Sequence, residues 1–115
     1  MDRDDTLRRL RAEALAQVER LDRDLIEVFE ASRSSNADDE HDPEGSTIAF
    51  ERAQLTALLA AGRRRVAELD DALARSAAGT YGGCERCGEP IPAERLAARP
   101  FATTCVTCAA RGRAP

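Results

Sequence analysis

The chain has 115 residues and a formal net charge of −4. This acidic balance argues against a protein that binds nucleic acid mainly through phosphate contacts, because such proteins present a basic face. Hydrophobic residues make up 43% of the chain but include only 3 Phe, 1 Tyr and no Trp, a mixture that suits long amphipathic helices better than an ordinary globular core.

The first predicted element is one long helix from about Asp5 to Ser32, with Thr6 as its N-cap. Its apolar residues recur at steps of three and four, apart from one polar gap at Arg11, which is the pattern of a heptad stripe. The stripe consists of Leu7, Ala14, Val18, Leu21, Leu25 and Val28.

A polar, acidic loop at about residues 33–46 follows this helix, and Pro43 and Gly45 both disfavour helix there. The loop carries five acidic residues: Asp38, Asp39, Glu40, Asp42 and Glu44. A second helix is predicted to begin at Ser46 or Thr47 and to stop at Gly79. Its stripe consists of Ile48, Leu55, Leu59, Gly62, Val66, Leu69 and Leu73.

Two stripes of similar length joined by a short loop predict an antiparallel coiled-coil hairpin over residues 1–78, with the acidic loop as its tip. Pairing positions whose numbers sum to about 80 places Gly62 opposite Val18, where the missing side chain admits a β-branched one. Phe29 and Phe50 then lie at similar height near the loop, either as a clasp or as ordinary core residues. Because the two stripes bury each other, we expect a monomer.

Four cysteines follow as two C-x-x-C pairs, Cys84 with Cys87 and Cys105 with Cys108. The N-terminus lacks the apolar stretch of a signal peptide and no apolar run is long enough to cross a membrane, so we expect a cytoplasmic protein. Thiols stay reduced in that compartment, so the pairs indicate a metal site rather than disulfides. A thioredoxin-like redox pair would need a βαβ context, which the sequence does not predict.

The spacing of the cysteines predicts one zinc ion held by all four sulfurs. Two residues between cysteines allow a tight turn to aim both sulfurs at one metal, and Gly88 relaxes the first turn. Four thiolates leave no position for water or substrate, so the zinc is predicted to be structural. The module, residues 79–115, is too small to fold on a core of its own and should need the metal.

The stretch from Tyr81 to Pro100, followed by the second cysteine pair, resembles the zinc finger of the DksA/TraR family of bacterial transcription factors. The segment Arg95-Leu96-Ala97-Ala98-Arg99-Pro100 makes the resemblance specific, and the long hairpin extends it over nearly the whole chain. The expected fold is therefore mainly α: a long antiparallel coiled-coil hairpin with a small C-terminal four-cysteine zinc finger.

The resemblance implies a transcription regulator that binds RNA polymerase directly, without sequence-specific contacts to DNA. Its coiled coil would enter the secondary channel of the polymerase and modulate initiation, and the five acidic residues of the tip would be its partner-binding residues. The tip departs from the family pattern, since Gly45 and Thr47 stand where the best-known members carry an aspartate and an alanine. The C-terminal helix of longer members is predicted to be short or missing.

The same features fit an alternative, a zinc-finger and coiled-coil module for protein interaction or dimerisation that does not act on RNA polymerase. We do not expect an enzyme, because no nucleophile–base pair or open metal position accompanies the acidic tip. His41, the single histidine, is interpreted as a solvated loop residue.

Overall fold

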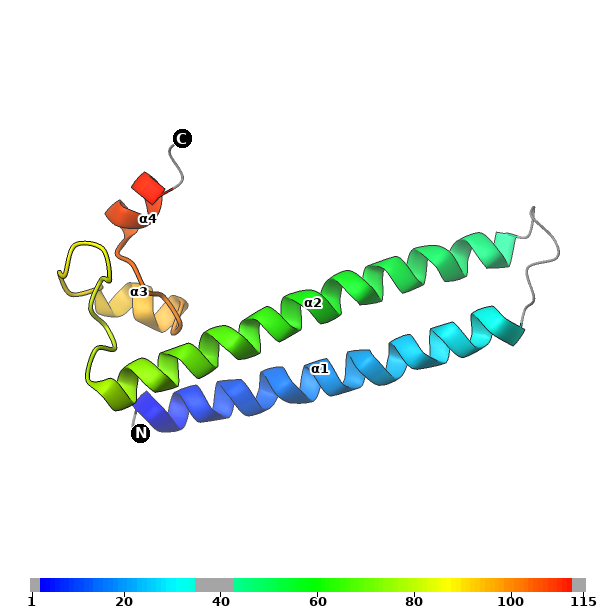
Figure 1. Ribbon diagram of the computed structural model, residues 1–115, viewed down its shortest axis with the longest axis horizontal. Coiled ribbons are helices and arrows are strands. Elements are labelled where there is room, and N and C mark those ends of the chain that lie inside the picture. Colours follow the sequence, from blue (N-terminus) through cyan, green and yellow to red (C-terminus); the bar gives the residue numbers. More distant parts are fainter. Residues whose placement is uncertain (1–2, 35–42, 113–115) are drawn as a thin grey trace. The chain divides into compact units, whose positions relative to one another are not determined.

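The computed structural model describes residues 3–34 and 43–112, and in these two stretches the chain is mainly helical. The helices are α1 (Arg3–Ser34), α2 (Pro43–Ala78), α3 (Ala93–Ala98) and α4 (Val106–Gly112). Figure 1 shows α1 and α2 side by side and running in opposite directions. Among the described residues, strand-like pairing is limited to one bridge between Gly83 and Pro90. The mainly α class with two long paired helices is confirmed.

Both long helices begin earlier than the capping residues predicted. The first helix begins at Arg3 rather than at Thr6, and the second begins at Pro43 rather than at Ser46 or Thr47. Proline is well tolerated in the first turn of a helix, because its missing N–H has no intrahelical acceptor there. Gly45 in the same turn weakens the helix by only about 1 kcal/mol relative to alanine.

The acidic tip lies mostly outside the residues that the structure describes. This applies to Asp38, Asp39, Glu40 and Asp42, and to the nearby His41. Glu44 falls in the first turn of α2. The tip therefore stays a prediction from the sequence.

The chain divides into two compact units, and each contains part of both long helices. One unit comprises Met1–Arg11 together with Ala67–Pro115, and the other comprises Ala12–Val66. The first unit thus groups the finger with the helix ends beside it. The division of the chain into residues 1–78 and 79–115 remains our proposal for its domain organisation. No described helix has the length and apolar character needed to span a bilayer.

In the unit Ala12–Val66 the two helices pair in the predicted register. A Cβ atom added at Gly62 would lie 3.0 Å from Cγ2 of Val18, so the two helices approach closely at this point. Asp22 and Arg63 form an exposed ion pair at 3.9 Å near the same level. The predicted opposition of Gly62 and Val18 is confirmed.

The buried residues of this unit come from the predicted stripes: Ala14, Leu21, Val28 and Leu59. The two phenylalanines, in contrast, are exposed, Phe29 at 45% and Phe50 at 72%, so their assignment as ordinary core residues was wrong, and the clasp stays a prediction. Each follows a stripe residue by one or two positions and therefore lies beside the buried stripe rather than within it. The guanidinium of Arg52 lies over the Phe29 ring, 5.4 Å from its centroid.

In the other unit the ends of α1 and α2 pack more tightly. Leu69 and Ala72 are completely buried and Leu7 is nearly so, although Ala72 lies off the predicted stripe. At this end α2 has neighbours on two sides. It meets α1 through a hydrogen bond of Ser76 to Asp4, and it meets the finger through Arg75, which donates to the Phe101 carbonyl at 3.4 Å.

Helix α2 stops at Gly79, as predicted. Gly79 has a φ of +79°, a left-handed conformation that costs glycine little. The Thr80 N–H donates to the Arg75 carbonyl at 2.9 Å and the Gly79 N–H to the Ser76 carbonyl at 3.2 Å. These two bonds form a Schellman motif, which satisfies the last carbonyls of the helix and turns the chain into the finger.

Candidate metal centre

The first cysteine pair lies in a tight loop closed by backbone hydrogen bonds. The Gly88 N–H donates to the Cys84 carbonyl at 2.9 Å, and the Cys84 N–H donates to the Glu89 carbonyl at 2.8 Å. Gly88 has a φ of +79°, so the predicted role of this glycine in the turn is confirmed. The loop returns the chain on itself and leaves the sulfurs of Cys84 and Cys87 on its inner side.

The second pair is placed by the start of α4. Cys105 precedes the helix and Cys108 lies in its first turn, where the Ala109 N–H donates to the Cys105 carbonyl at 2.9 Å. The Cys108 N–H donates to the Sγ atom of Cys105 at 3.4 Å. The helical turn thus brings the two sulfurs of the pair to the same side.

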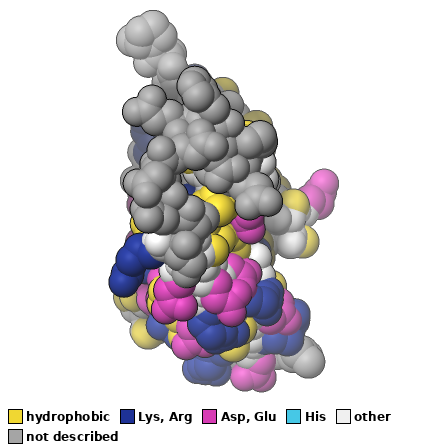
Figure 2. All heavy atoms as spheres, turned by 90° about the vertical axis from the view of Figure 1, so that its right-hand side faces the viewer, with side chains coloured by type: hydrophobic (Ala, Val, Ile, Leu, Met, Phe, Trp, Pro, Cys, Tyr) yellow, Lys and Arg dark blue, Asp and Glu magenta, His cyan; other side chains and the backbone are white. Residues whose placement is uncertain are grey.

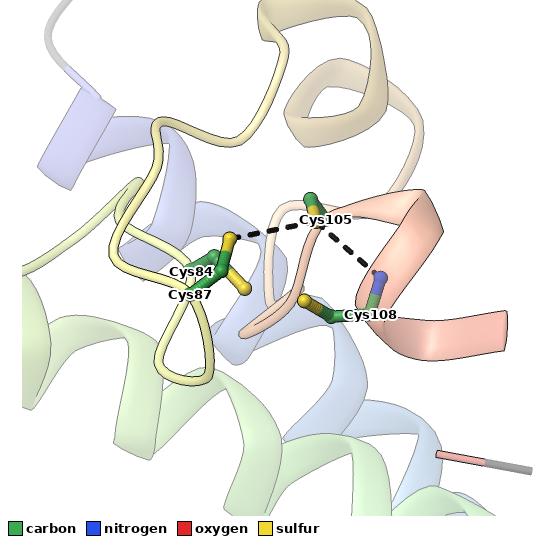
Figure 3. Close-up of side chains that lie close together, drawn as sticks. All are labelled: Cys84, Cys87, Cys105 and Cys108. Atoms are coloured by element: carbon green, nitrogen blue, oxygen red, sulfur yellow. Dashed lines mark hydrogen bonds between the residues drawn. The ribbon is translucent and has the colours of Figure 1, made fainter. Parts of the chain in front are cut away.

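The four sulfurs converge on one point, as Figure 3 shows. All four Sγ atoms lie within 4.8 Å of one another, and those of Cys87 and Cys105 are 3.9 Å apart. Sulfurs at the corners of a tetrahedron around zinc, with Zn–S bonds of about 2.3 Å, are separated by about 3.8 Å. The residues therefore fit the expected ion: the four cysteines are positioned to bind one metal ion with no position left for another ligand.

Side chains and backbone groups tie the two halves of the finger together around the sulfurs. Arg86 donates to the Cys108 carbonyl at 3.4 Å, and Arg95 donates to the Thr104 carbonyl at 2.8 Å, next to Cys105. The Glu85 N–H donates to the Thr103 carbonyl at 2.9 Å. The cysteine spacing did not predict these two arginines as supports of the site. The only sequence signal for Arg95 was its place in the family segment.

The thiols of the cluster differ in their pKa values. Hydrogen bonds from the backbone at Cys105 and Cys87 lower the pKa of Cys84 to about 6. The side-chain hydrogen bond with Cys105, followed by burial, raises the pKa of Cys108 to about 12. Thiols packed this closely cannot all ionise without a cation among them, so a bound dication would have to displace protons.

The core of the finger is built largely from the same cysteines. Cys84, Ile91 and Cys108 form the buried cluster, and Leu96 and Cys105 pack against it. Three of these five residues carry metal-binding sulfurs, so the packing of the finger and the metal site depend on each other.

The predicted partner-binding acids of the tip are not among the residues that form this centre, and four of the five lie outside the described residues. On the face drawn in Figure 2, the described arginine and acidic side chains are interspersed rather than sorted into patches of one sign. The described residues of that face therefore form no uniform basic surface of the kind that phosphate backbones select.

Comparison with known proteins gives matches to the finger and to the whole chain. The sequence profile of the prokaryotic dksA/traR C4-type zinc finger matches residues 79–111. The solved structure of transcription factor DksA2 from Pseudomonas aeruginosa superposes with a TM-score of 0.76 at 32% identity, covering 96% of this chain and 79% of that one.

Curated relatives match over shorter stretches. The RNA polymerase-binding transcription factor DksA of Caulobacter vibrioides is 50% identical over 44 residues, which are 38% of this chain and 31% of that protein. General stress protein 16O of Bacillus subtilis is 36% identical over 73 residues, which are 64% of this chain and 45% of that protein. An uncharacterized protein of Aquifex aeolicus is 55% identical over 42 residues, and the match spans 29% of its length.

The chain thus spans about a third of the length of the first two curated relatives, whereas its likeness to DksA2 extends over helices and finger together. With the converging cysteines, the finger profile and this match over 96% of the chain, the chain belongs to the DksA/TraR family.

Proposed function

We propose that the protein is a transcription regulator that binds RNA polymerase directly and inserts its acidic-tipped coiled coil into the secondary channel to modulate initiation. The observation that carries the proposal is the match to transcription factor DksA2 over 96% of the chain. A relative with the same finger, from Caulobacter vibrioides, is named for binding RNA polymerase. The pairing of α1 with α2 is consistent with a coiled coil as the inserted element.

For the finger, we propose that Cys84, Cys87, Cys105 and Cys108 ligate one structural Zn²⁺ ion. The distance of 3.9 Å between two of the sulfurs, close to the tetrahedral value of about 3.8 Å, supports this set. The bound ion would fix the fold of the finger and supply no reaction. Arg86 and Arg95 would hold the two cysteine pairs at the spacing that the ion needs.

For the tip, we propose that the five acidic residues of the helix connection act on the polymerase. Carboxylates brought near a catalytic Mg²⁺ ion or its basic surroundings experience a strong field, which gives them a physical means to alter initiation. In the sequence these residues stand between α1 and α2 or in the first turn of α2.

The test is in vitro transcription with the matching RNA polymerase, together with capture of the polymerase by the tagged protein. The tip variant combines Asp39→Asn and Asp42→Asn. Its matched control combines Asp24→Asn and Glu27→Gln, which remove the same charge from exposed positions on α1. We expect the tip variant to bind polymerase but to lose the effect on transcription, whereas the control keeps both.

Two results would contradict the proposal. Retention on free DNA without binding to polymerase would refute the polymerase-binding function itself. Equal loss of binding and transcriptional effect in the tip variant would assign the tip to docking instead. Sedimentation should show a monomer, because residues such as Leu21 and Leu59 are already buried within one chain, and a tight dimer would favour the alternative of a dimerisation module.

A further inference from the structure

Tyr81 occupies a connecting position in the unit that contains the finger and the helix ends. Its hydroxyl donates to the Pro100 carbonyl at 2.7 Å, which joins the chain before the first cysteine pair to the chain before the second. Partial burial raises the pKa of Tyr81, so the hydroxyl keeps its proton and remains a donor at neutral pH. The guanidinium carbon of Arg3 lies 4.7 Å from the centroid of the Tyr81 ring, which is a cation–π contact.

Arg3 in turn connects the finger to both long helices. While it lies over Tyr81, its Nη2 atom donates to the Ser76 hydroxyl at 3.0 Å. The Ser76 hydroxyl donates to a carboxylate oxygen of Asp4, the neighbour of Arg3 in α1. The beginning of α1 is therefore held by α2 through Ser76 and by the finger through Tyr81.

The finger can hold Tyr81 in place only while it keeps its own shape. The segment that positions Tyr81 is fixed by the hydrogen bond from the Ile91 N–H to the Gly82 carbonyl at 2.7 Å and by the bond to Pro100. Ile91 belongs to the small cluster in which three of five residues are cysteines of the metal site. Loss of the ion removes the restraint on those cysteines, and little else is buried there to keep the segment ordered.

We propose that the finger is a zinc-dependent clamp on the beginning of α1, with the ring of Tyr81 against Arg3 as its contact. This goes beyond binding to polymerase, since it assigns the finger a conformational role inside the chain itself. With zinc bound, Tyr81 stays in position and the first turns of α1 are protected. Without zinc, Tyr81 is released, Arg3 keeps only its contacts to the helices, and the first turns of α1 open more often.

Hydrogen–deuterium exchange of the full chain, zinc-loaded or treated with a chelator, tests the clamp. The informative amides are those of residues 7–11, because the amides before them have no intrahelical acceptor. One cation–π contact and its associated hydrogen bonding predict exchange about tenfold slower in the zinc-loaded chain than in the chelated one. In Arg3→Ala the exchange of residues 7–11 should be nearly the same with and without zinc.

Arg8→Ala is the matched control. Arg8 pairs with Asp4 and Asp5 on the same turns of α1, so its removal takes away a charge and ion pairs but no contact that Tyr81 makes. It should leave the effect of zinc on exchange intact. Zinc content per chain, measured by elemental mass spectrometry, verifies that each variant still carries the ion. Tyr81→Leu, which keeps the apolar bulk, should match Arg3→Ala.

The clamp is refuted if zinc does not change the exchange of residues 7–11 in the unaltered chain. It is also refuted if Arg3→Ala, with a full complement of zinc, retains the same effect of zinc as Arg8→Ala. Neither result depends on polymerase, so the clamp and the proposed function can fail separately.

Discussion

The close approach at Gly62 makes a sharp prediction about stability. Replacing a glycine within a helix by alanine ordinarily stabilises a protein by about 1 kcal/mol. Here the new methyl group would lie 3.0 Å from Cγ2 of Val18. Valine in a helix has one strongly preferred rotamer and cannot swing aside, and overpacking of this kind costs about 1–3 kcal/mol. We therefore expect Gly62→Ala to destabilise the chain by about 1 kcal/mol, the overpacking cost exceeding the gain in propensity.

The second half of the prediction is that the effect of Gly62→Ala on the free energy of unfolding changes sign when Val18 is also replaced. In a Val18→Ala background the obstructing methyl groups are gone, and Gly62→Ala should stabilise the chain by about 1 kcal/mol through helix propensity alone. The two positions should thus be coupled by about 2 kcal/mol in a double-mutant cycle. Urea unfolding of the zinc-loaded proteins, followed by far-UV circular dichroism, measures all four free energies of unfolding. Equal effects of Gly62→Ala in both backgrounds would refute the register of the hairpin.

Three further predictions concern the finger and its connection to α2. Gly79→Ala should lower the free energy of unfolding by about 1 kcal/mol, because alanine is strained at a φ of +79°, and urea unfolding will show whether it does. Cys87→Ser should reduce bound zinc from one ion per chain to well below one after dialysis, as measured by elemental mass spectrometry; full retention would exclude Cys87 as a ligand. Zinc affinity should rise with pH, by about tenfold per pH unit for each proton displaced. The raised pKa of Cys108 means that its proton must leave on binding, whereas Cys84, with a pKa of about 6, competes for protons only in more acidic solution. A competition titration with a chromophoric chelator at several pH values measures this slope, and a flat profile would contradict it.

The parts of the fold that depend on a repeating pattern could be predicted from the sequence. The heptad stripes place Leu7 and Leu69 in the core, and the pairing rule places Gly62 against Val18, because both follow from helix periodicity and the position of the loop. The cysteine spacing likewise predicts one metal site, since a C-x-x-C turn aims its two sulfurs by local geometry alone.

The parts that depend on a third neighbour could not be predicted in this way. Ala72 is completely buried although it lies off the stripe, and Arg75, three residues on, bonds to the finger through the Phe101 carbonyl, a contact that helix periodicity does not predict. Arg86 and Arg95 support the metal site by donating to the carbonyl groups of Cys108 and Thr104. These carbonyl groups come within reach only when the finger has folded, so the cysteine spacing does not predict the two contacts. The start of α2 at Pro43 differs from the prediction because proline and glycine disfavour the interior of a helix, whereas both are tolerated in its first turn.

The hydrogen bond between Ser76 and Asp4 joins residues 72 positions apart, whereas the bond from Arg95 to the Thr104 carbonyl within the finger spans 9. Closing the longer loop costs about 2 kcal/mol more chain entropy than closing the shorter one. The finger can therefore form from a short local stretch of chain, whereas the beginning of α1 is held only after a much longer loop has closed. We expect this first segment to be the last to become resistant to trypsin during refolding, with cleavage after Arg8 and Arg9 reporting its late arrival.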